Sequence, residues 1–204
     1  MRREIGLVAK RRAETMEENR AKLIGAARRA FAASGFAGAS MDDLTAEVGL
    51  TRGALYHGFG DKKGLLAAVV AQVDGEMAAR AQGAGSAAAT GWKRLIAEGE
   101  AYIEMALDPE VRRIVLLDGP AVLGDPATWS SQNACLDITK QAVAKLIAEG
   151  VMQTVNVEAA SRLLSGAAFN AALWVSASET PQNALPQAIA AFRLMAEGFL
   201  ARCG

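Results

Sequence analysis

Histidine is almost absent from this sequence, in which His57 is the only one among 204 residues. A Ser-His-Asp triad or a His-ligated metal cluster therefore cannot be assembled elsewhere, and an H-E-x-x-H zinc pair is excluded. Gly58, Gly60 and Gly64 follow a helical stretch and lack the spacing of a phosphate-binding loop. Neighbouring carboxylates are better explained as solvated surface. The sequence therefore predicts no enzyme, no metal site and no cofactor.

Cysteines and long apolar runs are also scarce. Cys135 and Cys203 lie far apart without C-x-x-C spacing, and two lone thiols would be poor scaffolding for a secreted protein. Hydrophobic residues make up 51% of the chain, yet no run approaches the ~20 uncharged residues that a membrane span requires. The first 14 residues are charged and carry no apolar stretch with a cleavage site. We expect a cytoplasmic protein without a membrane partner.

Net charge is zero, but the charges are unevenly placed along the chain. Residues 1–66 hold 12 Lys and Arg against 8 Asp and Glu, a net +4, whereas residues 67–204 hold 10 against 14, a net −4. A basic amino-terminal part followed by an acidic remainder fits a polyanionic partner at one end only. Ordinary scatter of surface charge explains the split equally well, so charge alone decides nothing.

What the sequence does contain is helical periodicity with clear capping signals, most densely from residue 40 to residue 66. Ser40 is a good N-cap for a helix from Met41 to about Val48, because its hydroxyl can accept a bond from an unpaired backbone N–H. Gly49 permits the positive φ that ends a helix, and Thr51 caps the next one. Two helices joined this tightly must cross steeply, as in a helix-turn-helix.

The same segment divides into inward and outward side chains. The apolar residues are spaced to face one small core: Leu44, Val48, Leu50, Leu55 and Phe59. The outer side is left with hydrogen-bonding groups and one small residue: Thr51, Arg52, Gly53, Tyr56 and His57. A DNA groove calls for donors at the base edges and for a small residue where the backbone meets phosphate. This arrangement predicts a DNA-reading helix.

The pattern T-R-G-A-L-Y-H-G-F-G-D-K-K-G-L-L resembles the DNA-reading signature of the TetR/AcrR family of bacterial transcriptional regulators, which is close to S-x-G-x-L-Y-x-H-F-x-x-K-x-x-L. The resemblance implies DNA-binding roles for seven residues: Ser40, Thr51, Arg52, Gly53, Tyr56 and His57 in or beside the major groove, and Lys62 at a phosphate. Gly58 stands where the family usually has a His that touches the DNA backbone, which puts that phosphate contact in question.

We predict an all-α fold of about nine helices in two domains. A basic arm without regular structure spans residues 1–14 and is either solvated or able to enter a minor groove. The helix-turn-helix domain spans residues 15–66, with a first helix from about Thr15 to Ser34 that Gly35 ends. A larger helical domain for effector binding and dimerisation spans residues 67–204.

Capping residues mark the later helices. Asp61 caps a helix that runs to about Gln82, and a flexible stretch follows at residues 83–91. The remaining helices are expected at 92–107, from Asp108-Pro109 to about 117, from Asp125-Pro126 to about 150, from Asn156, and from Thr180-Pro181 to about 202. The tripeptide Asp118-Gly119-Pro120 is expected to break its helix.

The last two helices are apolar over more than a third of their circumference, and a chain end can bury two sides only against another subunit. We therefore expect a homodimer through an intermolecular four-helix bundle, reading a palindromic double-stranded DNA operator. A deeply buried pair within a monomer is the alternative.

The resemblance also implies a small organic effector inside the larger domain. Candidate ligand-binding residues are large apolar side chains with a few polar anchors: Trp92, Tyr102, Met105, Arg112, Leu116, Trp129, Phe169, Asn170 and Trp174. An ordinary helical core would hold the same residues. A shortage of buried-looking charge favours a mainly hydrophobic compound. The expected function is a ligand-responsive repressor that releases its operator when the effector binds; a regulator, repressor or activator, without a ligand is the alternative.

Overall fold

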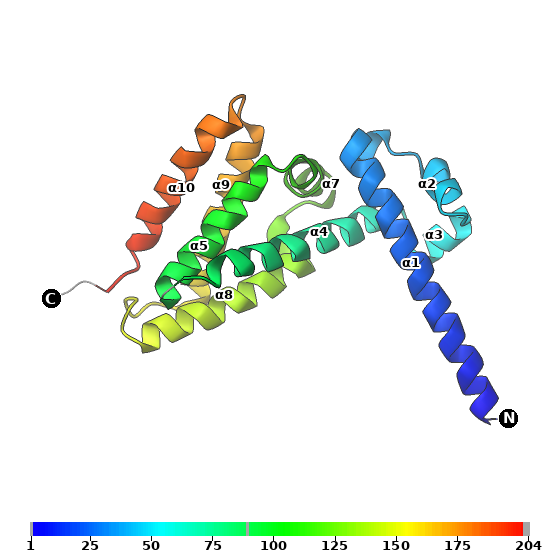
Figure 1. The fold of residues 1–204 in the computed structure, drawn as a ribbon, viewed down its shortest axis with the longest axis horizontal. Helices are drawn as coiled ribbons and strands as arrows, with labels where there is room; N and C mark the ends of the chain where they lie inside the picture. The colour runs from blue at the N-terminus through cyan, green and yellow to red at the C-terminus, as the bar shows by residue number, and fades with distance from the viewer. Residues whose placement is uncertain (1, 89, 202–204) are drawn as a thin grey trace. The chain divides into compact units, whose positions relative to one another are not determined.

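The computed structural model describes residues 2–88 and 90–201, with side chains from residue 11 onward. Within these ranges every regular element is helical, apart from one isolated antiparallel bridge between Met152 and Leu200. The predicted all-α fold is thus confirmed (Figure 1). Contacts divide the chain into two compact units, Met1–Val70 and Ala71–Gly204. The division falls inside one helix, whereas the sequence analysis placed the boundary after residue 66.

The first unit contains α1 (Arg2–Gly38), α2 (Met41–Glu47), α3 (Arg52–Phe59) and the start of α4 (Lys62–Gly85). The helix start expected near Thr15 is wrong, because α1 already begins at Arg2. The Thr15 hydroxyl donates to the carbonyl of Arg11 (2.9 Å), a bond within the helix rather than a cap. Residues 2–14 lack proline and are rich in straight-chain side chains, which favour helix without an apolar face.

The predicted caps of the first unit are confirmed. The Ser40 hydroxyl accepts from the backbone N–H of Asp43 (3.3 Å), and the Thr51 hydroxyl accepts from Ala54 (3.2 Å). The Asp61 carboxylate accepts from the N–H three residues later (2.7 Å). Gly35 and Gly49 have φ of 71° and 67°, as glycines at helix interruptions do. These local bonds fix where α2, α3 and α4 begin.

The turn between α3 and α4 depends on Gly64. A Cβ at this position would lie 2.0 Å from the carbonyl oxygen of Phe59, far inside any permitted contact. Leu44 and Leu55 are buried in the core of this unit together with Phe31. Val48, Leu50 and Phe59 of the predicted core are only half-buried. The core therefore holds the three short helices with α3 at the surface.

The second unit is a helical bundle built on the remainder of α4, α5 (Gly91–Glu104), α8 (Ser130–Ala148), α9 (Val157–Ala177) and α10 (Pro181–Glu197). Helix α9 packs against α5, α8 and α10, so it is the central helix of the bundle (Figure 1). One part of the core joins four of these elements through mainly aliphatic side chains: Leu95, Val143, Leu146, Met152, Ala160, Leu164 and Ala196.

The expected helix break at Asp118-Gly119-Pro120 is wrong. Short α6 (Pro109–Val111) leads into a π-helix, η2 (Arg112–Asp118), which leads into α7 (Gly119–Leu123). Pro120 lies in the first turn of α7, directly after the π-helix, which interrupts the regular α-helical hydrogen-bonding pattern. The run ends only at Gly124, with φ of 86°. Counted as one helix, this run brings the described residues to nine helices, as predicted.

Three other boundaries differ from the predicted ones. Asp125 caps only the short η3 (Pro126–Thr128), so α8 begins at Ser130. Helix α5 ends at Glu104 and is followed by the 3-10 turn η1 (Met105–Leu107). Helix α10 ends at Glu197 because the chain beyond it pairs with residues 151–153: Gln153 N–H donates to Phe199 and Ala201 N–H to Val151, both at 2.9 Å.

Candidate nucleic-acid interface and effector cavity

Helix α3 turns its predicted DNA-reading side chains outward. Thr51, Arg52, Gly53, Tyr56 and His57 are all exposed, and Tyr56 keeps 49% of its surface accessible. The helix is held from behind by the fully buried Leu55. An exposed short helix, capped at its start by a hydroxyl and backed by a core leucine, can enter a DNA groove without rearrangement of the unit.

Arg52 forms a two-point ion pair with Asp42 of α2. Its Nε and Nη2 both face the carboxylate, one nitrogen to each oxygen, and both side chains are more than half exposed. An arginine has five N–H donors in a planar fork, so the outer edge of the guanidinium remains available to a base or a phosphate. Sequence reasoning did not identify Asp42 as the partner that orients this side chain.

Lys62 and Arg20 are held close to the domain rather than extended into solvent. The Lys62 ammonium donates to the carbonyl of Ala37 (3.4 Å) and lies 4.8 Å from the centre of the Phe36 ring. Arg20 of α1 donates to the carbonyl of Gly58 (3.0 Å) and lies over the ring of Phe59. The Arg20 side chain therefore holds the end of α3 in place, next to Gly58, the position at which the sequence departs from the family pattern.

Two glycines of α3 are not required by the fold. A Cβ at Gly53 would meet only the Thr51 hydroxyl at 3.7 Å, an ordinary contact, and one at Gly58 would meet nothing within 4 Å. Glycine inside a helix costs about 1 kcal/mol relative to alanine. The fold therefore leaves room for a larger side chain at Gly53, and a small residue there fits the close approach to DNA that the family resemblance implies. Ser40, by contrast, is exposed but occupied as the cap of α2.

The second unit contains a cavity of about 100 Å³ between α4, α5, α8, α9 and α10. Its walls are mainly aliphatic and aromatic, with a polar side on α5 and α8. The lining residues are Ala78, Ala81, Gln82, Leu95, Glu98, Gly99, Tyr102, Gln132, Cys135, Ile138, Thr139, Leu164, Ser165, Ala168 and Phe192. Of the nine predicted ligand-binding residues, this cavity includes one, Tyr102.

The structure does not bring the other eight predicted residues into one site. Phe169 and Trp129 lie behind Tyr102. The ring centroid of Phe169 is 6.4 Å from that of Tyr102 and 6.3 Å from that of Trp129. Met105 and Leu116 are buried core residues, and Arg112 is exposed. Trp92 borders a separate depression beside α5 and α10, and Asn170 and Trp174 face outward from α9. Large side chains at helical spacing do not reveal which wall of a bundle they face.

A buried polar triangle, which the sequence analysis missed, stands behind the cavity wall. Asp74 of α4 is 0% exposed and accepts from Nε2 of Gln132 at 2.9 and 3.1 Å. The same nitrogen donates to the hydroxyl of Tyr102 (3.2 Å). Burial raises the pKa of Asp74, and bonds from Ser131, Gln132 and Tyr102 oppose the shift. The expected shortage of buried charge is therefore wrong at this position.

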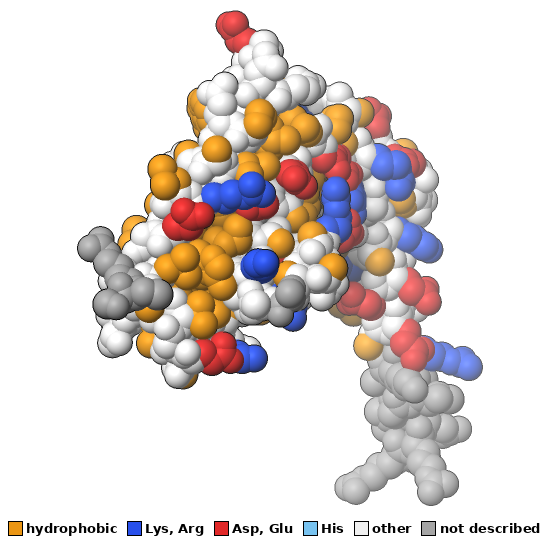
Figure 2. Space-filling view, turned by 60° about the vertical axis from the view of Figure 1, so that its left-hand side comes forward, with side chains coloured by type: hydrophobic (Ala, Val, Ile, Leu, Met, Phe, Trp, Pro, Cys, Tyr) orange, Lys and Arg blue, Asp and Glu red, His pale blue; other side chains and the backbone are white. Residues whose placement is uncertain are grey.

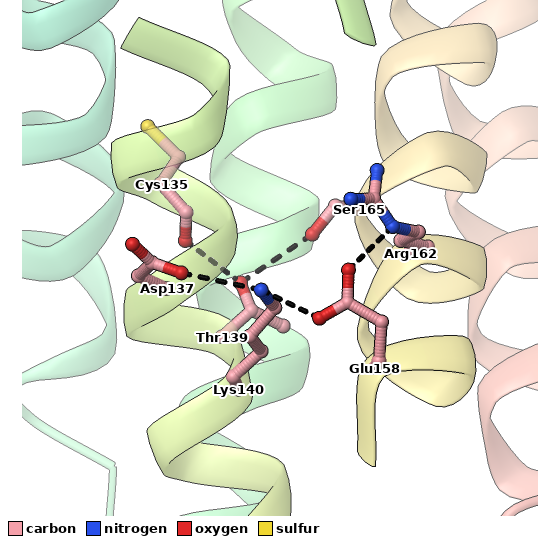
Figure 3. A network of polar contacts seen from close by, with 7 residues as sticks. All are labelled: Cys135, Asp137, Thr139, Lys140, Glu158, Arg162 and Ser165. Carbon is pink, nitrogen blue, oxygen red and sulfur yellow. Dashed lines mark hydrogen bonds and ion pairs between the residues drawn. The ribbon is translucent and has the colours of Figure 1, made fainter. Parts of the chain in front are cut away.

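Cys135 lines the same cavity as a protonated thiol, since burial and the nearby Asp74 raise its pKa to about 11. Figure 3 shows it in a polar network between α8 and α9. Thr139 donates to the carbonyl of Cys135 (3.2 Å) and accepts from Ser165 (3.4 Å). Further out, Glu158 receives Lys140 at 2.5 Å and Arg162 at 2.6 Å. The hydroxyl end of this network borders the cavity, whereas its charged end holds α8 to α9.

An apolar groove runs between the outward faces of α9 and α10. Its walls include Leu163, Trp174 and Met195, which are 61%, 50% and 40% exposed, together with small residues such as Gly166 and Ala191. Hydrophobic side chains gather in several patches on the face of this unit that Figure 2 shows, and charged side chains lie between the patches. Large exposed apolar surface of this kind marks an interaction site.

An outward-facing helix-turn-helix followed by a helical bundle with a largely apolar cavity is typical of a class of DNA-binding regulators. Residues 23–69 match the family of bacterial regulatory proteins of the tetR type, and residues 92–199 match the tetracyclin repressor-like C-terminal domain. A TetR-family transcriptional regulator from Pectobacterium atrosepticum is 44% identical, with a TM-score of 0.82 over 94% of this chain and 98% of that one. The chain belongs to the TetR family of transcriptional regulators.

More distant structures share the fold alone. A bacterial regulatory protein of the tetR family from Rhodococcus RHA1 is 17% identical, with a TM-score of 0.61 over 90% of this chain and 98% of that one. The fatty acid degradation regulator from Bacillus halodurans is 14% identical, with a TM-score of 0.64 over 85% and 93%. No curated protein matches the chain. The family and these similar structures are transcriptional regulators, not enzymes.

Two further features bear on partners. Among the helices that the structure describes, none is long and apolar enough to cross a lipid bilayer. Within the same residues, no group of three or more His, Cys, Asp or Glu side chains is placed to hold a metal ion.

Proposed function

We propose that this regulator binds a palindromic operator as a homodimer and releases it when a small, mainly hydrophobic molecule enters the cavity of the second unit. The DNA-binding part is supported by the exposed face of α3. This face includes a glycine, Gly53, at a position where the fold would also accept a larger residue. We assign Thr51, Arg52, Gly53, Tyr56 and His57 to the groove, with Ser40 and Lys62 beside it. A cytoplasmic location, expected from the sequence, belongs to the same proposal.

The DNA-binding part is tested by selecting duplexes from a random library with the full chain and measuring their affinity against unselected duplexes. Gly53→Ala should weaken binding to selected DNA by about tenfold or more, because the added methyl stands between helix and phosphate backbone. The melting temperature should not fall, since alanine favours helix. Selection of no sequence by the natural protein, or unchanged affinity of the variant, would contradict this assignment.

Dimerisation through α9 and α10 is supported by the apolar groove, which a second copy of the chain would cover by two-fold symmetry. Two reading helices are then available for two half-sites about one turn of DNA apart. Sedimentation at micromolar concentration should report a dimer, and Leu163→Arg should shift it to a monomer. Leu107→Arg, at an exposed residue outside the groove, is the matched control. A monomeric natural protein would refute the dimer.

The effector part rests on the cavity, which is partly open to solvent, largely apolar and provided with a few polar groups. Its occupant would be bounded by α4, the helix that runs from the first unit into the second. A regulator without a ligand, repressor or activator, is the second candidate. Thermal shift against small organic compounds separates the two, because a ligand of the native state raises the melting temperature by mass action. Compounds that do so should also change DNA affinity.

A further inference from the structure

Most of the polar side chains that line the cavity donate their hydrogens to other groups of the protein rather than into the cavity. Gln132 Nε2 donates to Asp74 and to the Tyr102 hydroxyl. The Tyr102 hydroxyl in turn bonds to the carboxylate of Asp74. Ser165 donates to Thr139, and Thr139 donates to the carbonyl of Cys135. Four side chains on the cavity wall therefore have their hydrogens already engaged.

Asp74 determines which end of the Gln132 amide remains free to bind another group. A carboxylate only accepts hydrogen bonds, so the amide nitrogen must face Asp74 and a flipped amide would set two oxygens against each other. Oε1 of Gln132 has no hydrogen-bond partner among the described residues. The fully buried side-chain atoms without a partner among these residues are Trp129 Nε1 and Ser161 Oγ, so Oε1 of Gln132 is not fully buried. Gln132 lines the cavity, and Oε1 is the end of its amide that remains available to a ligand.

The rest of the wall fits a small apolar body. Leu95, Leu164, Ile138 and Phe192 surround the space, and the volume of about 100 Å³ is comparable to the roughly 150 Å³ of an apolar cavity known to admit benzene. Glu98 adds another acceptor, bonded to Arg94 through one oxygen. Gln82 can present either end of its amide and adds no preference.

We propose that this cavity selects small, largely apolar molecules that carry a hydrogen-bond donor, a hydroxyl or an amine, which bonds to Oε1 of Gln132. Asp74 is the positioning residue, because it holds the amide in the orientation that presents oxygen rather than hydrogen. A compound of the same shape with only acceptors meets an oxygen opposite its own oxygen and loses a bond without replacement. This inference rests on the proposed effector function and names the chemistry of its ligand.

Matched pairs of single-ring compounds test the donor preference on the full-length protein. The pairs are phenol with anisole, aniline with N,N-dimethylaniline, and benzyl alcohol with benzaldehyde, measured by titration calorimetry and thermal shift. The donor of each pair should bind about tenfold more tightly than its partner, the factor expected for one hydrogen bond. Equal affinities within the pairs, or no binding by any donor, would overturn the proposal.

Asp74→Asn tests the positioning role, since a neutral amide can either donate or accept and leaves Gln132 free to turn. The tenfold preference should fall close to one, with little change in the affinity for acceptor compounds. Asp137→Asn makes the same change on an exposed carboxylate of α8 and should keep the preference. If Asp74→Asn does not fold, Gln132→Met provides the same readout, because it keeps the volume and removes the amide. A preference that persists in a folded variant of either kind refutes the assignment.

DNA binding is measured separately on the same samples. A chain that binds no DNA would disprove the proposed regulator while leaving the cavity preference intact. Donor compounds that bind without changing DNA affinity would likewise remove the effector role alone.

Discussion

The two units of this protein build their functional surfaces in opposite ways. In the first, the candidate interface comes from one short stretch, from Ser40 to Lys62, whose helices are started by their own hydroxyl and carboxylate caps. In the second, the cavity takes its walls from five helices, with lining residues that run from Ala78 to Phe192. A single substitution should therefore be enough to abolish DNA binding by the first unit. In the second unit, a single substitution should leave the cavity in place and change only which ligands it prefers.

The largest effect should come from Gly64→Ala, which breaks the turn between α3 and α4. A Cβ 2.0 Å from the Phe59 carbonyl forces the backbone to move, and overpacking of this kind costs about 1–3 kcal/mol. The loss should be confined to the first unit. All three tryptophans, Trp92, Trp129 and Trp174, belong to the second unit, so their fluorescence reports that unit alone.

Thermal unfolding followed by circular dichroism should therefore show an earlier transition in Gly64→Ala that tryptophan fluorescence does not follow. DNA binding should be lost with it. If the unfolding curves of Gly64→Ala and the natural protein coincide, the stability of the first unit does not depend on this turn. The two units would then not differ in their sensitivity to a single local change.

Arg52→Ala should have the next largest effect, on DNA recognition rather than on folding. If the outer edge of the guanidinium reaches a base, the change costs about 1–3 kcal/mol on selected DNA and relaxes the preference at one position. Lys62→Ala is the contrasting variant, because a phosphate contact weakens binding to all sequences and lowers the salt slope by about one charge. Fluorescence anisotropy on selected and random duplexes, over a range of salt, distinguishes them. Equal losses on both duplexes would place Arg52 at a phosphate.

The Asp42 carboxylate makes this comparison sharper. It lies beside the proposed DNA surface, so Asp42→Ala removes a negative charge that repels phosphates and should raise affinity for random DNA severalfold. Asp43→Ala is the control for charge alone. Asp43 is also exposed, but no arginine among the described residues forms an ion pair with it. A gain confined to Asp42→Ala indicates that the ion pair restrains Arg52. Equal gains would indicate only a general repulsion.

Much of the first unit could be predicted from the sequence, and little of the cavity. The caps at Ser40, Thr51 and Asp61 each accept from the backbone N–H three residues later, so the residues that determine them are neighbours in the sequence. Asp74 and Gln132 meet across 58 residues of chain, and nothing in the sequence around either of them distinguishes it from a surface residue. Asp74 sits among Val73, Gly75 and Glu76, which reads as an ordinary solvated helix.

The boundary errors have equally local explanations. Proline at 120 predicts a helix end only if the preceding turn is regular, and the π-helix from Arg112 to Asp118 removes that condition. The end of α10 was placed too late because pairing of residues 199–201 with 151–153 is a long-range contact. Only Tyr102 of the predicted ligand-binding residues lines the cavity, because bulky residues on a bundle helix can equally be core residues, as Leu116 is.

A smaller effect is expected from the pH dependence that Asp74 imparts to the second unit. Burial raises its pKa above the usual 3.8, so the folded state holds the proton more tightly than the unfolded one. Its contribution to stability is present below that value and is lost as pH rises through the raised pKa. The pKa values of Tyr102 and Cys135 are raised further from this window and add no slope within it.

Urea unfolding followed by tryptophan fluorescence, from about pH 4 upward, should show the natural protein losing stability relative to Asp74→Asn as pH rises. Asp137→Asn, on an exposed carboxylate, should run parallel to the natural protein. A constant difference between the natural protein and Asp74→Asn would mean that the carboxylate titrates at its ordinary value despite its burial.

The smallest effect should come from Gly58, where the fold leaves open space. Gly58→Ala should stabilise the first unit by up to about 1 kcal/mol, because alanine is the better helix former and its methyl meets nothing within 4 Å. The carbonyl bond from Arg20 is unaffected by the side chain. Gly58→His supplies a donor where the family usually has one and should strengthen binding to selected and random DNA alike, by no more than severalfold. A loss of affinity in Gly58→His, with stability kept, would mean that His57 already occupies the phosphate position and that the interface is arranged differently from its relatives.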